Sequence, residues 1–191
     1  MNKNTFEFLR TNHALGGRTF FMNEFVDYGR LLFLGMRGKI KRGVYNVAGK
    51  KLDKKTLESY WKDIFAVGRN WRAELFDAIF QSKGRDLKIY QNHTFSNDGK
   101  FVKFDSNLLD ERTLMKDKTP GISLEDYLNS NHTSQGLPNK NVKSGDLYYW
   151  FSESENSAAR FDAGPNWAGL GCNWDPLGRF PGLGARTVKQ D

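Results

Sequence analysis

Residues 156–188 read Asn156-Ser-Ala-Ala-Arg-Phe-Asp-Ala-Gly-Pro-Asn-Trp-Ala-Gly-Leu-Gly-Cys-Asn-Trp-Asp-Pro-Leu-Gly-Arg-Phe-Pro-Gly-Leu-Gly-Ala-Arg-Thr-Val188. Lys, Glu, Gln and Met do not occur in this stretch, although these four types supply 33 of the 191 residues of the chain. A proportional share for a stretch of this length would be about six such residues. Gly, Pro, Asp and Ala are common instead, and they follow no secondary-structure period. We therefore expect this C-terminal stretch to determine both the fold class and the function of the protein.

The N-terminal part of the chain predicts helices. Apolar side chains recur at helical spacing over residues 20–36, and glycines follow the pattern. Residues 56–67 repeat that spacing, with Thr56 as a candidate N-cap and Gly68 as the stop. A third helix is expected over residues 71–80, where Leu, Phe and Ile share one side.

The middle of the chain predicts a hairpin. Residues 87–90 alternate between apolar and polar types like a short strand. The Asn-Asp-Gly sequence at 97–99 is a turn signal, and it joins residues 94–95 to residues 101–104.

The segment before the C-terminal stretch predicts a short helix and a strand. Ser123 is a candidate N-cap for a helix over residues 123–128, with an acidic residue three positions later. Residues 129–143 are polar and predict a long loop. Residues 147–151 are aromatic and short enough to predict a buried strand. Because helices precede the strands along the chain, the fold class is expected to be α+β.

The charge and the cysteine content of the chain limit the classes of protein to which it can belong. The chain has 29 Lys and Arg against 22 Asp and Glu, a formal net charge of +7. This charge suits a soluble protein as well as one that binds nucleic acid or an anionic surface. Cys172 is the single cysteine, so an internal disulfide framework is excluded. With no apolar signal peptide or transmembrane run, we expect cytoplasmic synthesis and no membrane insertion, with a phage virion or the cell surface as a destination.

Motifs near the C-terminus resemble a known fold family. Tyr149-Trp-Phe-Ser-Glu-Ser154 is similar to the strand that opens the last β-meander of C-type lectin folds of the formylglycine-generating-enzyme type. Phe161-Asp-Ala-Gly-Pro-Asn-Trp167 and Gly182-Leu-Gly-Ala-Arg186 resemble the closing strands of that family. Ala185 stands where the family usually has Phe, and Asp162-Ala-Gly-Pro165 replaces Arg-Gly-Gly-Ser. The resemblance implies a C-type-lectin-like fold with N-terminal helices and a C-terminal antiparallel β-meander.

The resemblance also implies a domain organisation. One C-type-lectin-like domain is expected over residues 1–191. Residues 1–90 would form its mainly helical part, and residues 147–191 would form a β-rich variable region.

Within that fold, the stretch resembles the variable proteins of diversity-generating retroelements. In these systems a reverse transcriptase mutates template adenines, so that an Asn codon AAC becomes any codon of the form NNC. Lys, Glu, Gln, Met and Trp cannot arise in this way, and Trp167 and Trp174 would therefore be fixed framework residues. The resemblance implies that the diversified, ligand-binding positions are Asp162, Ala163, Gly164, Pro165, Ala168, Gly169, Gly171, Cys172, Asp175, Pro176, Gly178, Arg179, Phe180 and Pro181.

A surface that accepts almost any side chain needs a backbone held in place by other residues. Buried aromatic and aliphatic side chains can supply that support. The expected anchors are Trp167, Trp174, Leu170, Leu177 and Leu183. The variable side chains would then face solvent, where Arg179 and Phe180 are the best candidates to contribute binding energy. The expected partner is a protein or a cell-surface ligand, with a homo-oligomer or docking to a larger particle as further options.

Other interpretations remain open at this point. A Gly- and Pro-rich irregular terminus on a sheet would also avoid Lys and Glu. Enzymes of the formylglycine-generating type use cysteine and copper chemistry, and Cys172 stands in a different context, so no activity, cofactor or metal is expected. Glu153 and Glu155 could pair on one strand face, but solvent-facing carboxylates are the simpler interpretation. A basic module that binds nucleic acid or protein without catalysis is the alternative function.

Overall fold

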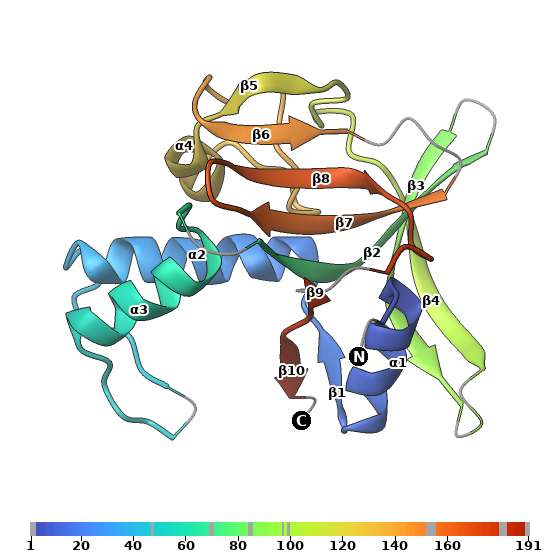
Figure 1. Ribbon diagram of the computed structural model, residues 1–191, viewed down its shortest axis with the longest axis horizontal. Helices are drawn as coiled ribbons and strands as arrows, with labels where there is room; N and C mark the ends of the chain where they lie inside the picture. Colours follow the sequence, from blue (N-terminus) through green and yellow to red (C-terminus); the bar gives the residue numbers. More distant parts are fainter. Residues whose placement is uncertain are drawn as a thin grey trace.

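The structure is a computed structural model that describes residues 3–46, 48–68, 71–83, 86–96, 98, 100–151, 156–179 and 183–189. Within these ranges the chain is a mixed α+β protein, as its order of elements predicts. The helices Met22–Met36, Lys54–Ile64 and Leu124–Asn129 lie toward the left of Figure 1, whereas the helix Thr5–Ala14 lies at the lower right and a large sheet spans the rest.

The helices begin at identifiable N-caps. They are α1 (Thr5–Ala14), α2 (Met22–Met36), α3 (Lys54–Ile64) and α4 (Leu124–Asn129). The predicted helices over 20–36 and 123–128 are confirmed as α2 and α4, and Ser123 caps α4 as expected. The N-cap predicted for α3 is wrong, because Asp53 accepts the backbone N–H of Thr56 at 2.7 Å and the helix begins earlier. Within the described residues, no helix is both long and apolar enough to cross a membrane.

The large sheet is mostly antiparallel. Its strands lie in the order β4-β3-β2-β7-β8-β6-β5, and β9 pairs with β2 off this path. Two of its pairings, β6 with β8 and β2 with β9, are parallel. The bounds are β2 (Arg72–Lys83), β3 (Asp86–Phe95), β4 (Phe101–Leu108), β5 (Lys118–Ile122), β6 (Leu147–Trp150), β7 (Asn156–Ala163), β8 (Ala168–Trp174) and β9 (Leu183–Gly184).

A smaller sheet brings the two ends of the described chain together. Strand β1 (Gly17–Thr19) pairs antiparallel with β10 (Thr187–Lys189). β1 leads directly into α2, so the end of the chain lies beside the start of its longest helix (Figure 1). The C-terminal segment is held there by Arg186, which forms ion pairs with Asp63 at 2.9 Å and Glu74 at 3.2 Å.

The helix predicted over residues 71–80 is wrong, because this segment is the central strand β2. β2 lies between β3 and β7, and Leu75, Phe76 and Ala78 through Phe80 are all buried. A strand that is buried on both faces is a continuous apolar run, which periodicity alone does not separate from a helix. The mainly helical part expected over residues 1–90 therefore ends at Ile64.

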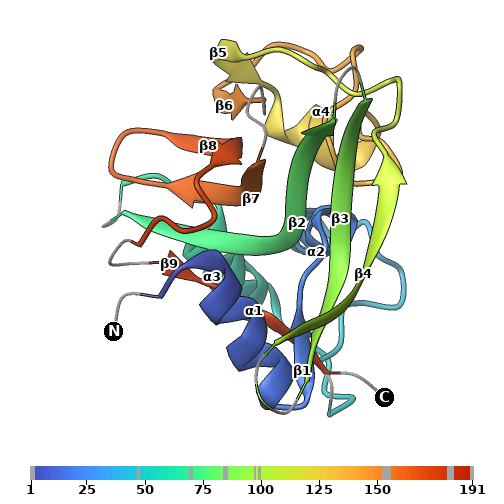
Figure 2. The same ribbon diagram turned by 90° about the vertical axis from the view of Figure 1, so that its right-hand side faces the viewer.

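The predicted hairpin is confirmed and is longer than expected. β3 pairs with β4 from Lys88↔Leu108 to Phe95↔Phe101. Both β2 and β3 are interrupted by register shifts, between Leu75 and Ile79 and after Gln91. At these positions the sheet turns sharply, so that its β3–β4 end stands upright beside α1 (Figure 2).

The core lies on one face of β6, β7 and β8. Figures 1 and 2 together show α2 and α4 behind these strands. Phe161 of β7 packs against Phe25 of α2 and Phe65 at the end of α3, with ring centroids 5.4 and 5.1 Å apart. Leu170 of β8 and Tyr149 of β6 are completely buried in the same cluster. The opposite face of these three strands is turned away from the helices.

Candidate ligand-binding face

Side chains on the outer face of β6, β8 and β7 line up in two rows. Alternate residues of a strand point to opposite faces, and paired residues share a face. In one row Tyr148 pairs with Gly169, which pairs with Asp162. In the next row Trp150 pairs with Gly171, which pairs with Arg160. The central strand therefore presents two glycines between aromatic residues on one side and a charged pair on the other.

Gly169 makes room for the ring of Trp150. A Cβ atom at position 169 would lie 2.3 Å from Cζ3 of that ring, which is too close for any side chain unless the ring moves. At Gly171 a Cβ atom would meet its nearest neighbours at 3.6 to 3.9 Å, an ordinary contact distance. The indole of Trp150 thus lies across β8, and the small residues of β8 let it do so.

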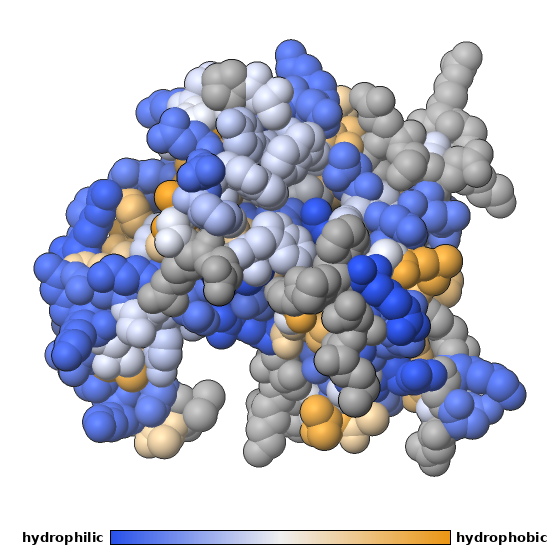
Figure 3. All heavy atoms as spheres, viewed as in Figure 1, coloured by the Kyte–Doolittle hydropathy of each residue, from blue (hydrophilic) through white to orange (hydrophobic). Residues whose placement is uncertain are grey.

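Three aromatic rings contact each other on this face. The rings of Tyr148 and Trp150 are 5.6 Å apart, and the ring of Trp167 lies 5.4 Å from that of Trp150 at 83°. All three side chains are half-buried, so each keeps part of its ring in solvent. Seen from the side of Figure 1, the surface over β6 and β8 has intermediate hydropathy (Figure 3). We call Tyr148, Trp150, Trp167, Gly169 and Gly171 the aromatic face.

A buried charged pair borders the aromatic face. Arg160 donates from Nε to Oδ2 of Asp162 at 2.8 Å, and their side chains are 16% and 1% exposed. The guanidinium also lies over the ring of Trp174, 3.6 Å from its centroid, and 5.7 Å from that of Trp71. An extra residue in β8, between the pairs Ala158↔Trp174 and Arg160↔Gly171, directs Trp174 onto this face. We call Trp71, Arg160, Asp162 and Trp174 the Arg160 cluster.

Burial dominates the electrostatics of the Arg160 cluster. It raises the pKa of Asp162 to about 6, although the neighbouring Arg160 opposes this shift. Burial also lowers the pKa of Arg160, again against the attraction of its partner. Nη1 of Arg160 and Oδ1 of Asp162 are buried and make no hydrogen bond among the described residues. The pair therefore retains unused hydrogen-bonding capacity beside the aromatic rings.

A groove of about 550 Å³ opens on the other side of Trp167. It lies between the end of α3, the start of α4 and the start of β6, and Phe65, Leu124 and Asp146 are among its lining residues. This volume falls within the range that ligand sites in proteins occupy. Trp167 belongs both to the aromatic face and to the lining of the groove.

The structure divides the predicted ligand-binding residues by strand alternation. Asp162, Gly169 and Gly171 lie on the outer face, but both glycines are buried there, contrary to the expectation that these positions face solvent. The expectation that the variable side chains face solvent is wrong for Ala163, Ala168 and Cys172, which point into the core and are at most 8% exposed. Asp162 is itself buried, and its carboxylate accepts from Arg160.

The remaining predicted positions lie in turns. Pro165 is exposed and Gly164 is buried in the β7–β8 turn. After β8, Asp175 and Arg179 are exposed and Gly178 is half-buried. Pro176 is buried, contrary to expectation, and its carbonyl accepts the N–H of Thr5 at 3.1 Å. Phe180 and Pro181 lie outside the described residues.

The predicted anchors are only partly as expected. Leu170 is completely buried. Leu177 was expected to be an anchor, but its side chain is 65% exposed, so this prediction is wrong. Trp167, Trp174 and Leu183 are half-buried. The two tryptophans support the backbone from the outer face and at the same time belong to the surface that a ligand would meet.

Sequence reasoning missed Tyr148 and Trp150 as surface residues. Residues 147–151 predict a wholly buried strand, yet burial alternates along β6, with Leu147 and Tyr149 inside and the other two half-exposed. The only sequence signal for this arrangement is alternation between the two faces of the strand. That signal is weak here because aromatic residues occur on both faces. Glu153 and Glu155, considered as paired carboxylates, lie outside the described residues.

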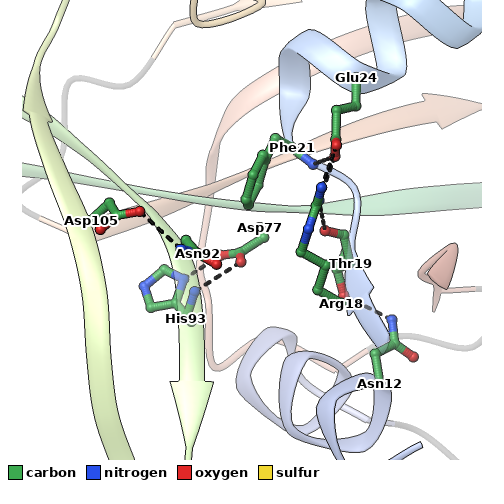
Figure 4. A network of polar contacts seen from close by, with 9 residues as sticks. All are labelled: Asn12, Arg18, Thr19, Phe21, Glu24, Asp77, Asn92, His93 and Asp105. Carbon is green, nitrogen blue, oxygen red and sulfur yellow. Dashed lines mark hydrogen bonds and ion pairs between the residues drawn. The ribbon is translucent and has the colours of Figure 1, made fainter. Parts of the chain in front are cut away.

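A second polar cluster lies far from this face, at the sharp turn of the sheet. Oδ2 of Asp77 on β2 accepts the backbone N–H of His93 at 3.0 Å, and Oδ1 contacts the ring Nδ1 of His93 (Figure 4). The N–H of Asp77 is donated to the carbonyl of Phe20 at 2.9 Å. Nearby, Asn92 has φ of 56° and donates to Asp105 at 2.9 Å. These contacts join β2, β3, β4 and the segment before α2 at the turn of the sheet.

The Asp77–His93 pair suits a structural role better than a catalytic one. A cavity of about 180 Å³ beside His93 is lined mainly by apolar and aromatic side chains, among them Phe6, Ile79 and Phe104. Both side chains of the pair are at most 3% exposed. Within the described residues, no group of three or more His, Cys, Asp or Glu side chains could hold a metal ion.

No protein-family model, curated protein or solved structure matches the chain.

Proposed function

We propose that the protein is a non-enzymatic binding protein that uses the outer face of β6, β8 and β7 to contact a protein or cell-surface ligand. One observation carries this proposal. Three half-exposed aromatic rings, two from β6 and one from the turn before β8, lie together beside the two glycines of β8, with a ligand-sized groove on one side and a buried charged pair on the other. Clustered Trp and Tyr side chains with part of their area in solvent are the groups that most often dominate binding energy.

The scaffold and the variation of its surface can be described more closely. We propose a C-type-lectin-like scaffold of the formylglycine-generating-enzyme type, with a region varied by a diversity-generating retroelement. The order of elements supports the scaffold, because β7 and β8 are followed by a turn and by the short strand β9. Beyond β9, Arg186 joins the tail to α3 and β2.

The alternation of side chains between the two faces of a strand limits the positions that could vary. Ala163, Ala168 and Cys172 touch the core, where almost any replacement would clash or leave a cavity. Asn166 and Asn173 are exposed, and Asn is the residue that an unmutated AAC codon specifies. The proposed variable positions are therefore Pro165, Asn166, Gly171, Asn173, Asp175 and Arg179, whereas Gly169 is kept as glycine by the ring of Trp150.

A genomic comparison tests this proposal. We expect a near-repeat of the 3′ end of the gene close to a reverse transcriptase gene, with differences at adenines of the template. The differences should fall in the codons of outward-facing residues such as 166, 173 and 175. A repeat whose differences fall equally in the codons of 163, 168 and 172 would contradict the assignment of the surface. A gene without such a repeat would overturn the diversification.

A library experiment tests the surface itself. One library places NNC codons at 165, 166, 171, 173 and 175, and a matched library places them at 159, 161, 163, 168 and 172. We expect most members of the first library to stay resistant to protease and to yield binders against a panel of unrelated proteins. Members of the second should be cleaved, because they alter the core. Equal loss of folded protein in both libraries would sink the proposal.

A further inference from the structure

The positive charge of the chain is concentrated in one segment. Residues 37–55 contain eight Lys and Arg and one Asp, a formal charge of +7, which equals that of the whole protein. The rest of the chain has 21 Lys and Arg against 21 Asp and Glu and is formally neutral. Because the net charge is concentrated in a tenth of the sequence, it creates a strong positive electrostatic potential around that segment. Charge spread over the whole surface would mainly increase solubility.

This segment leaves the end of α2 and returns to the start of α3 as a hairpin. Tyr45 and Lys51 form an antiparallel bridge, and the N–H of Leu52 is donated to the carbonyl of Val44 at 2.8 Å. Val44 is 5% exposed and packs against Leu57 in the core, which fixes the root of the hairpin. Figure 1 shows the hairpin extending away from the sheet beyond α3. We call residues 37–55 the basic arm.

The basic residues of the arm point into solvent. All eight side chains belong to exposed residues, and the surface over this part of the molecule is largely hydrophilic (Figure 3). Among the described residues, two of the eight form ion pairs, Arg37 with Glu125 at 2.9 Å and Lys54 with Glu58 at 3.8 Å. Both of these pairs are exposed and therefore weak. The other six basic residues of the arm form no ion pair with the described part of the chain.

The apolar side chains of the arm favour nucleic acid over a membrane. A segment that lies in a membrane surface exposes Leu, Phe or Trp opposite its basic residues. In the arm Val44 is buried and Ile40 and Leu52 are half-buried, whereas Tyr45 is 53% exposed beside its partner Lys51. Exposed aromatic rings among Lys and Arg are the combination that contacts bases and phosphates together.

We propose that the basic arm binds the phosphate backbone of a nucleic acid, with Tyr45 placed against a sugar or base. The arm is a loop closed by one β-bridge, and both a duplex and a single strand offer phosphates that such an exposed basic loop can contact. The site does not depend on the aromatic face, so either proposal can fail without the other.

Fluorescence anisotropy with labelled oligonucleotides tests the arm. The probes are a duplex and a single strand of about 20 nucleotides, titrated from about 50 to about 200 mM salt. We expect binding to weaken steeply with salt. The triple variant Lys41→Glu, Arg42→Glu and Lys50→Glu should bind at least tenfold more weakly, and its log–log salt slope should be smaller by about 3. Tyr45→Ala should weaken binding of the single strand by about tenfold, and Tyr45→Phe should not.

A charge-matched control separates the arm from the net charge. The variant Lys100→Glu, Lys116→Glu and Lys140→Glu has the same net charge as the arm variant and changes exposed residues elsewhere. We expect it to retain the affinity of the wild type within about threefold. Equal losses in both variants would overturn the proposal, as would wild-type protein that does not bind either probe at low salt. Binding to phosphatidylserine vesicles without binding to the oligonucleotides would overturn it in favour of a membrane.

Discussion

At the scale of single residues, burial sets the chemistry of the outer face. Asp162 is almost completely buried, and its one ionic partner, Arg160, does not compensate for the loss of water. The pKa of Asp162 is therefore raised to about 6. The carboxyl group changes its charge near pH 6, on the strand that borders the proposed binding surface.

Asp162→Asn should change the pH dependence of stability. A raised carboxyl pKa in the folded protein favours folding below about pH 4, and this contribution is lost as the pH rises through about 6. Wild-type protein should lose about 3 kcal/mol of unfolding free energy from this group across that range, and Asp162→Asn should not. Urea unfolding at about pH 4, 5, 6 and 7 measures the difference. Parallel pH profiles for the two proteins would contradict the raised pKa.

Two strand glycines should respond very differently to alanine. At Gly121 of β5, a Cβ atom would lie 1.5 Å from the carbonyl oxygen of Leu147, a backbone atom that cannot move aside. Gly121→Ala should separate β5 from β6 and cost about 3 kcal/mol or more. Gly171→Ala, the matched control, meets only ordinary contact distances and should cost under about 1 kcal/mol. Chemical denaturation compares them, and equal costs would count against the close approach of β5 to β6.

At the scale of elements, polar contacts and irregular pairing shape the sheet. β2 and β3 both lose register near Asp77 and His93, and the sheet turns at this point (Figure 2). The Asp77 carboxylate accepts from the backbone of the neighbouring strand, so one side chain replaces hydrogen bonds that the irregular ladder lacks. The turn places β3 and β4 beside α1 and leaves β6, β7 and β8 as a separate, flatter surface.

Removing the Asp77 carboxylate should loosen this turn. Asp77→Ala takes away the acceptor of the His93 N–H inside a buried site and should cost about 3 kcal/mol. Asn92→Gly is the local control, because φ of 56° suits glycine, and it should change stability by less than about 1 kcal/mol. Amide hydrogen exchange should show faster exchange at residues 77 and 93 in Asp77→Ala alone. Unchanged protection there would show that the turn is held by other contacts.

At the scale of the whole molecule, the two ends of the described chain close the fold. β10 pairs with β1, and Arg186 connects the same tail to α3 and to β2. Burial raises the pKa of Glu74, and Arg186 limits that rise. The tail is therefore attached by a short sheet and by a partly buried ion pair.

Arg186→Met should destabilise the protein in a pH-dependent way. Without the guanidinium the pKa of Glu74 rises further, so the charged carboxylate opposes folding at neutral pH and the protonated one does not. We expect the free energy of unfolding to fall by about 1 to 2 kcal/mol near pH 8 and by less near pH 4. These values are modest because the side chains of Arg186 and Glu74 both keep some contact with solvent, which screens their interaction. Lys54→Met, which breaks an exposed pair, should change stability by less than about 0.5 kcal/mol at either pH. Thermal unfolding at both pH values measures the difference. An equal loss of stability at both would exclude an effect through the pKa of Glu74.

The helices with clear local signals could be predicted from the sequence. α2 has an uninterrupted apolar period and α4 has a Ser123 cap, and both signals lie within one short segment. The hairpin of β3 and β4 could be predicted equally well, because its turn and both of its strands follow one another in the sequence. β2 was not, because a strand buried on both faces has no period of its own until its neighbours are known.

The sequence by itself determined the α+β class, the unusual composition of residues 156–188 and the collection of charge in residues 37–55. Only the tertiary structure decided which side of each strand faces the core. Asp162 and Ala163 are adjacent in the chain, yet one belongs to the outer face and the other to the core, because strand pairing with β8 sets the alternation. The parallel pairing of β6 with β8 brings the ring of Trp150 against Gly169, and no local pattern encodes that contact.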